Sequence, residues 1–301
     1  MPSSRASRRT LLAGLVAAAA GAPLLNTLSA TPAHAADAAD TLTNSRLYAD
    51  PANVEGVDYA RRFKRHEMFD PQRATTPGPR LSTVMAIHGG GIEPGTSELC
   101  LAIAGFRPDT LEPVAAGAPL HDYWMFEGLR APGAVPGNGD LHVTSTLNDD
   151  PVARSMAAGS TNVLSLHGCT ATQAGLPAGA KGVVVGGANG RLRALLADRL
   201  GKAGFLIATG DPEHLNGDLP DNICNRTLTG EGGGQLEITY DLRKSLFADF
   251  GGAPNATSPT RRAQSTNTDF WKFTDACRSA LAQMESEQLA RRSLFDRGAG
   301  V

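Results

Sequence analysis

The chain has 301 residues, including 34 glycines and 19 prolines, and a formal net charge of −2 with histidine neutral. This length fits one large domain, and the glycine and proline content predicts many loops without reaching the level of a disordered chain. The slightly acidic balance argues against nucleic acid as a partner.

The first 35 residues have the order of a secretory signal peptide. Arg5, Arg8 and Arg9 precede an apolar, alanine-rich run, and Ala-His-Ala at 33–35 forms an A-x-A cleavage pattern. The apolar run is too short to span a bilayer comfortably. We therefore expect cleavage after Ala35, a secreted protein and no stable membrane insertion afterwards.

The arginine pair lies in Ser-Arg-Arg-Thr-Leu-Leu at 7–12, which resembles the signal for twin-arginine export of folded proteins. The twin-arginine export machinery is then a transient partner, and an ordinary signal with two adjacent arginines is the alternative. Removing residues 1–35, which hold three arginines and no acids, lowers the net charge from −2 to −5. A polyanionic substrate would have to be held by local arginines rather than by the overall field.

The rest of the chain is predicted to form a processed arm at 36–54 and one main domain at 55–250. A loop or linker rich in Pro, Asn, Ser and Thr follows at 251–268, and a charged helix and tail occupy 269–301. Strands are predicted at 81–87, 121–127, 141–146, 161–166, 182–186, 205–208 and 235–242, and helices at 96–104, 192–200 and 270–292. Strands that alternate with helices indicate a single α/β domain with a mixed, mostly parallel sheet flanked by helices.

Two of the apolar strands end at a histidine that is followed by glycine. His88 opens the run His-Gly-Gly-Gly-Ile-Glu-Pro-Gly-Thr at 88–96, and His167 follows the strand at 161–166. The carboxyl ends of strands face the ligand crevice of α/β proteins, and glycines let the backbone approach a ligand closely. With Glu93, which opens the next helix, these histidines form a candidate zinc set that leaves a fourth position for water. Glu98, one turn further on, is an alternative to Glu93, and ordinary hydrogen-bonded histidines are the plainer interpretation.

Hydrolysis with zinc-activated water also needs a general base within reach of the water. Glu237 is the candidate, because it lies in a predicted strand whose neighbours are mostly apolar. The plainer interpretation is that Glu237 points to solvent, which the alternation of side chains along a strand would allow. The four cysteines, Cys100, Cys169, Cys224 and Cys277, form no CxxC pair, which argues against a cysteine zinc site. Both a Cys169–Cys224 disulfide and four buried free thiols remain open.

Five motifs together resemble the poly-γ-glutamate hydrolase family. The first is His-Gly-Gly-Gly-Ile-Glu-Pro-Gly-Thr-Ser-Glu at 88–98. The others follow in family order, spanning with it about residues 59–243: Leu-His-Val-Thr-Ser at 141–145, Ser-Leu-His-Gly-Cys at 165–169, Asn-Ile-Cys-Asn-Arg at 222–226 and Gln-Leu-Glu at 235–237. The family is similar in fold to zinc carboxypeptidases. The resemblance implies a zinc ion held by His88, Glu93 and His167, with Glu237 as general base.

The same resemblance implies an exported, zinc-dependent hydrolase of γ-glutamyl amide bonds in the polyanionic polymer poly-γ-glutamate. Thr227 stands where we expect glycine, and Gly233-Gly234 where we expect a bulkier residue. These departures bear on substrate preference rather than on metal binding.

Three further residues are candidates for contact with the substrate. Arg226 is the first choice for a carboxylate clamp, because a guanidinium pairs with a carboxylate as a two-pronged fork. A structural ion pair is the alternative for this arginine. His142 is a candidate for contacting substrate or for supporting the metal ligands, unless it is an ordinary strand histidine. Arg191 is a weaker carboxylate candidate.

Three other functions compete with this interpretation. A zinc amidase or carboxypeptidase could act on other γ-glutamyl or peptidoglycan stem peptides. A serine esterase could use His-Gly-Gly-Gly as an oxyanion loop, but it requires a G-x-S-x-G nucleophile elbow, which the sequence lacks. A non-catalytic binding protein would tolerate loss of the candidate zinc ligands and base, all of which are present.

Overall fold

The computed structural model describes residues 41–66, 81–209, 215–251 and 260–298. The predicted signal peptide, its cleavage site and the twin-arginine motif lie outside these residues. Within them, no helix combines the length and apolar character needed to cross a membrane.

One seven-stranded sheet forms the centre of the described domain, in the order β1-β3-β2-β4-β7-β5-β6. Its strands are β1 (Tyr59–Lys64), β2 (Ser82–Gly90), β3 (Asp122–Gly128), β4 (Asn162–Cys169), β5 (Gly182–Gly186), β6 (Leu206–Ile207) and β7 (Gly234–Thr239). The central strands β3, β2, β4 and β7 are parallel, whereas β1 and β5 run antiparallel to their neighbours β3 and β7. The predicted mixed, mostly parallel sheet is therefore confirmed, and the carboxyl ends of β2, β4 and β7 meet at one edge.

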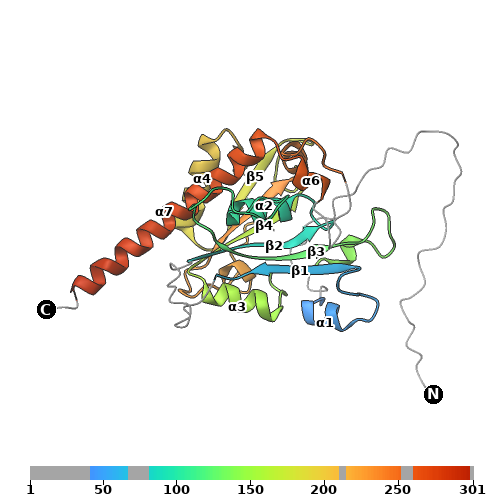
Figure 1. Ribbon diagram of the computed structural model, residues 1–301, viewed down its shortest axis with the longest axis horizontal. Coiled ribbons are helices and arrows are strands. Elements are labelled where there is room, and N and C mark those ends of the chain that lie inside the picture. The colour runs from blue at the N-terminus through green and yellow to red at the C-terminus, as the bar shows by residue number, and fades with distance from the viewer. Residues whose placement is uncertain (1–40, 67–80, 210–214, 252–259, 299–301) are drawn as a thin grey trace, which may run out of the picture.

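Helices cover both faces of this sheet (Figure 1). One face carries α2 (Thr96–Ala104), α4 (Gly190–Lys202), α5 (Tyr240–Ser245) and α7 (Thr268–Gly298), with the short α6 (Arg261–Gln264) beside them. The other face carries α1 (Asn44–Ala49), α3 (Pro151–Gly159) and the 3-10 turns η1 (Asn138–Leu141) and η2 (Ile223–Asn225). Strand residues alternate between the two cores: Val84 packs under α2 and α7, and Met85 packs on the opposite side.

The C-terminal helix belongs to this domain rather than to a separate tail. Phe270, Phe273 and Leu281 of α7 are fully buried in the core shared with α2 and α4. Part of the expected linker is also structured, because α6 places Arg262 in a buried position. At the other end, α1 lies within the stretch expected to be a loose arm, and its Leu47 is buried.

One predicted strand is wrong. Residues 141–146 contain the end of η1, an extended segment and a turn, and none of them pairs with the sheet. The alternation of apolar and polar residues there arises because Leu141 and Val143 point into the core beside α3. All four cysteines are buried and free, and Cys169 and Cys224 lie in different apolar clusters, so the structure favours free thiols over a Cys169–Cys224 disulfide.

Candidate metal centre

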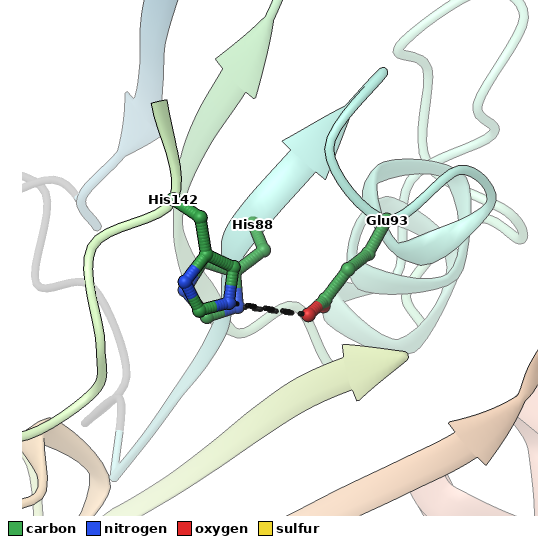
Figure 2. A group of neighbouring side chains, drawn as sticks. All are labelled: His88, Glu93 and His142. Carbon is green, nitrogen blue, oxygen red and sulfur yellow. Dashed lines mark hydrogen bonds and ion pairs between the residues drawn. The ribbon is translucent and has the colours of Figure 1, made fainter. Parts of the chain in front are cut away.

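His88 lies near the carboxyl end of β2 with its ring orientation fixed by the backbone. Its Nε2 is 2.8 Å from the carbonyl oxygen of Val143. A carbonyl can only accept a hydrogen bond, so Nε2 carries a proton and Nδ1 is the ring atom that faces the rest of the cluster. That Nδ1 lies 3.0 Å from Oε1 of Glu93. Figure 2 marks this contact with a dashed line.

The glycine loop after His88 brings Glu93 back to the end of the strand. Gly90 has φ +66°, a conformation that favours glycine, and a side chain there would also collide with the backbone of Gly128. The amide of Glu93 then donates to the carbonyl of His88 at 2.8 Å, and α2 begins three residues later. The three consecutive glycines therefore place a carboxylate and an imidazole from a short segment side by side.

His167 approaches the same point from β4. Its Nδ1 lies 3.2 Å from Nδ1 of His88, and the two rings meet at 73° with their centroids 4.9 Å apart. Its Nε2 is 3.0 Å from Oγ of Ser165, which can accept the proton of that nitrogen. Burial, followed by the charge of His88, lowers the pKa of His167 to about 3, so this imidazole is neutral at ordinary pH. Nδ1 of His167 and Nδ1 of His88 face each other at 3.2 Å, a distance at which one proton or one cation between them can be shared.

Glu93 supplies the negative charge of the cluster. Burial alone would raise its pKa, but the charge of His88 and the close approach of His142 and His88 outweigh burial and hold the pKa well below its usual range. Its second oxygen, Oε2, accepts the backbone N–H of Gly168 at 2.8 Å. A buried carboxylate is thus held ionised beside three imidazoles.

The structure adds His142 to this group. Its ring stacks on that of His88 with centroids 3.8 Å apart, and its Nε2 lies 3.8 Å from Oε1 of Glu93. One ligand atom from each of His88, Glu93 and His142 lies within 4.8 Å of the others, and His167 is not part of this group among the described residues. The sequence left the role of His142 open between substrate contact, support of the ligands and an ordinary strand position. The strand wrongly predicted at 141–146 gave no indication that His142 lies close to His88.

Glu237 lies next to the cluster on β7. It is the register partner of His167 on the adjacent strand, so both side chains point to the same face of the sheet. Its Oε1 accepts a hydrogen bond from Gln235 at 3.0 Å, whereas its Oε2 is buried with no hydrogen-bond partner among the described residues. Burial and then the charge of Glu93 raise the pKa of Glu237 well above its usual value. A carboxyl group with a raised pKa beside a cluster of metal-ligand residues is suited to exchange protons.

The two candidate arginines occupy different places. Arg226 ends η2, pairs with Asp221 at 3.2 Å and remains partly exposed. The turn η2 is attached to the segment after His142, because the amide of Ile223 donates to the carbonyl of Ser145 at 3.0 Å. Arg191 instead lies at the start of α4, in the helix layer over the opposite face of the sheet.

Arg191 forms an exposed ion pair with Glu287 of α7 at 2.6 Å, so the structure gives no geometric support for a clamp at this position. Glu98, the alternative ligand to Glu93, is also directed elsewhere. It accepts hydrogen bonds from Thr260 at 2.6 Å and from Arg262 at 3.2 Å.

Sequence reasoning missed a buried arginine that joins the segments of the cluster. Arg243 of α5 donates to the carbonyl of Pro94 at 2.7 Å and to that of Ile238 at 3.1 Å, next to Glu93 and Glu237 respectively. Its guanidinium lies so close to Gly168 that a side chain at this position would overlap it. No local pattern identifies this role, because the acceptors are backbone carbonyls from distant segments.

Comparisons with solved structures agree with this fold. A bacteriophage poly-γ-glutamate hydrolase superposes with a TM-score of 0.61 and 25% identity, covering 81% of this chain and 97% of the phage enzyme. A zinc-free apo structure of YndL gives a TM-score of 0.58 and 31% identity, covering 80% of this chain and 96% of that one.

Similar sequences come from Bacillus subtilis (strain 168). YndL is 34% identical over 193 residues, and the SPbeta prophage-derived protein YoqZ is 33% identical over 177 residues. The matches cover 64% and 58% of this chain, and 64% and 55% of the two relatives, which is less than two thirds of their length. The family model for poly-γ-glutamate hydrolases matches residues 63–276, well over half of the chain and all of the cluster described above. The chain therefore belongs to the poly-γ-glutamate hydrolase family.

Proposed function

We propose that this chain is an exported, zinc-dependent hydrolase of γ-glutamyl amide bonds in poly-γ-glutamate. The observation that carries the proposal is that Nδ1 of His88 lies 3.2 Å from Nδ1 of His167 and 3.0 Å from the ionised carboxylate of Glu93, with the carboxyl group of Glu237 on the strand next to His167. The family and the fold of the phage hydrolase support the substrate class.

The donor set fits zinc. Imidazole nitrogen and carboxylate oxygen are its common protein ligands, and a site with three of them keeps one position open. His88 and His167 would bind through Nδ1, since Nε2 of each ring already faces an oxygen, and Glu93 would complete the set. Zinc, when bound, polarises the scissile carbonyl and acidifies water. The structure of the relative YndL is described as a zinc-free apo form, and that description supports zinc as the metal of this chain.

The chain's own side chains carry out the proton transfer and contact the substrate. Glu237 takes a proton from the attacking water and returns it to the nitrogen of the leaving amine. His142, stacked on His88 and close to Glu93, is placed to donate a hydrogen bond to the substrate. The buried surroundings of these groups limit the access of bulk water and strengthen each electrostatic contact.

The linkage preference follows from the position of the substrate carboxylate. In a γ-linked chain each residue has a free α-carboxylate close to the scissile amide, whereas in an α-linked chain the carboxylate lies two methylenes further out. An arginine fixed near the site can pair with only one of these positions, and a misplacement of about 1 Å already costs heavily in rate. We assign this clamp to Arg226, which would exchange its exposed partner Asp221 for the substrate.

Zinc analysis of purified variants tests the ligand set. His167→Ala should lose bound zinc, whereas His142→Ala should retain it with reduced turnover, because we place His142 on the substrate side. Full zinc occupancy in His167→Ala together with loss in His142→Ala would exchange the two histidines in the ligand set. Full occupancy in both variants would contradict this metal site.

Incubation with γ-linked and α-linked polyglutamate tests the substrate class. We expect cleavage of the γ-linked polymer and little cleavage of the α-linked one. Arg226→Lys should slow cleavage of the γ-linked polymer, because the charge stays but the fork is lost. Arg191→Lys is the matched control and should cleave normally. Equal rates on the two polymers would refute the linkage preference, and an unaffected Arg226→Lys enzyme would refute the clamp alone.

A further inference from the structure

Three buried polar side chains form a row that ends at Glu237. Asn222, just before η2, donates from Nδ2 to Oε1 of Gln235 at 2.8 Å. Gln235 in turn donates from Nε2 to Oε1 of Glu237 at 3.0 Å. Gln235 and Glu237 are two residues apart on β7 and therefore point to the same face of the sheet. The row links the loop around η2 to the proposed general base.

The direction of this row is set by a backbone amide. The N–H of Cys224, which can only donate, lies 3.1 Å from Oδ1 of Asn222. That contact assigns the oxygen of the Asn222 amide, so its NH2 group must face Gln235. The oxygen of the Gln235 amide must then face Asn222, and its NH2 group must face Glu237. The backbone N–H of Cys224 fixes the orientation of the Asn222 amide, and the Asn222 amide fixes that of Gln235.

The two oxygens of Glu237 consequently differ. Oε1 receives an N–H and cannot also hold a proton along that direction. Oε2 is buried and has no hydrogen-bond partner among the described residues. We propose that Asn222 and Gln235 are positioning residues that make Oε2 of Glu237 the oxygen that takes and returns the proton. The proposal rests on the function given above, in which Glu237 is the general base.

The proton balance of the step is closed. An O–H bond of water breaks, its proton forms a bond to Oε2 of Glu237, and the water oxygen bonds to the scissile carbonyl carbon. The same proton then moves from Oε2 to the amine nitrogen as the C–N bond breaks, which restores the carboxylate. Through both transfers Oε1 keeps its hydrogen bond from Gln235, so the carboxylate does not rotate.

Gln235→Met tests the last link of the row, because methionine has a similar length and no N–H donor. We expect kcat to fall by about 10- to 100-fold, the range typical for partners that orient a catalytic group, with KM and bound zinc unchanged. Gln288→Met is the matched control. Its amide pairs with Asn162 at 2.8 and 2.9 Å at the start of β4, so that variant loses partly buried amide hydrogen bonds away from the cluster and should keep its kcat.

Asn222→Asp tests the direction of the row with little change of shape. The new carboxylate can still accept from Cys224, but it has no N–H for Gln235. The Gln235 amide should therefore reverse and present its carbonyl oxygen to Glu237. We expect a fall in kcat as large as that of Gln235→Met, and no further fall in the double variant, because both changes remove the same hydrogen bond.

The outcomes separate this proposal from the proposed function. Near-normal kcat in folded, zinc-loaded Gln235→Met, with Glu237→Gln inactive, would overturn the positioning role and leave the general base intact. Full activity in Glu237→Gln would overturn the general base and the row with it. Loss of zinc in Gln235→Met, or fully additive effects of the two substitutions on kcat, would also overturn the positioning role.

Discussion

Glu93 and Glu237 are both buried in the same region of the protein, yet their surroundings shift their pKa values in opposite directions. Glu93 receives the N–H of Gly168 and the charge and hydrogen bond of His88, which keep it ionised. Glu237 receives one amide N–H and faces the charge of Glu93, so burial dominates and its pKa rises. Two carboxyl groups with opposite shifts are suited to different tasks, one as a ligand and the other as an acid–base group.

Glu237→Gln should separate these tasks. The amide is nearly isosteric, so we expect the variant to keep its fold and its zinc, but it cannot take the proton from water. The expected loss in kcat is about 10²-fold or more. Steady-state kinetics on γ-linked polyglutamate with parallel metal analysis measures it. Near-normal turnover in a zinc-loaded variant would assign the base to another residue.

Removal of metal should expose the cost of burying His167. Its pKa is about 3 in the folded protein and about 6.5 in an unfolded chain. Between these values the unfolded chain binds a proton that the native state does not, so stability is present above about pH 6.5 and is lost as the pH falls toward 3. Chelator-treated protein should therefore unfold at lower urea concentration at about pH 4 than at about pH 7. The stability of metal-free His167→Gln should depend less on pH than that of the metal-free parent protein. An equal pH dependence in the two proteins would show that His167 is not its origin.

At the scale of single residues, the sequence predicted those site residues whose chemistry is indicated by the local sequence pattern. His88 and His167 lie near the ends of apolar strands, Glu93 follows the first of these strands, and Glu237 lies within an apolar strand; the structure brings these four residues into one region. Arg243 escaped detection because its function depends on the carbonyls of Pro94 and Ile238, whose proximity is created only by folding.

At the scale of elements, prediction succeeded where the ends of an element are defined by local chemistry. The helix α2 has the predicted bounds, because Gly95 and Gly105 on either side adopt left-handed conformations that end the helical path. The strand β1 was missed because it is an edge strand with Arg61, Arg62 and Lys64, which do not resemble a buried strand. The helix α3 was also missed, although Asp150 caps it and Pro151 opens it.

Gly168→Ala should reveal how closely β4 packs on α5. The added methyl would overlap the guanidinium of Arg243, which must move away from the carbonyl of Pro94. We expect a loss of about 1–3 kcal/mol of unfolding free energy, typical of overpacking, and weaker zinc retention. Gly159→Ala is the control, because a methyl there meets only Arg65 at an ordinary 3.7 Å. Equal free energies of unfolding of the two variants in urea would show that the side chain of Arg243 can move without a loss of stability.

At the scale of the whole molecule, composition and alternation of strands and helices were enough to predict the fold class. They predicted the C-terminal helix but not its packing on the main domain, since the loop rich in Pro, Asn, Ser and Thr before it resembles a boundary between separate parts. The apolar face of α7 instead completes the core over α2 and α4. Domain boundaries depend on which apolar faces meet, and that information is not local.

The proposed export concerns the whole chain and is testable independently of catalysis. Arg8→Lys combined with Arg9→Lys should leave the precursor inside the cell, because the paired arginines lie before the apolar run as in twin-arginine signals. Fractionation followed by immunoblotting measures this. Unchanged export of the double variant would indicate the general secretory route.

The burial of α7 also determines when the chain can complete its folding during synthesis. The ribosome makes the sheet and the helices α2 and α4 before it makes α7, so their shared apolar surface has no cover in the nascent chain. Phe270, Phe273 and Leu281 are among the late residues that close it. Chains that terminate early therefore present this surface to chaperones and proteases, and only full translation yields a compact molecule.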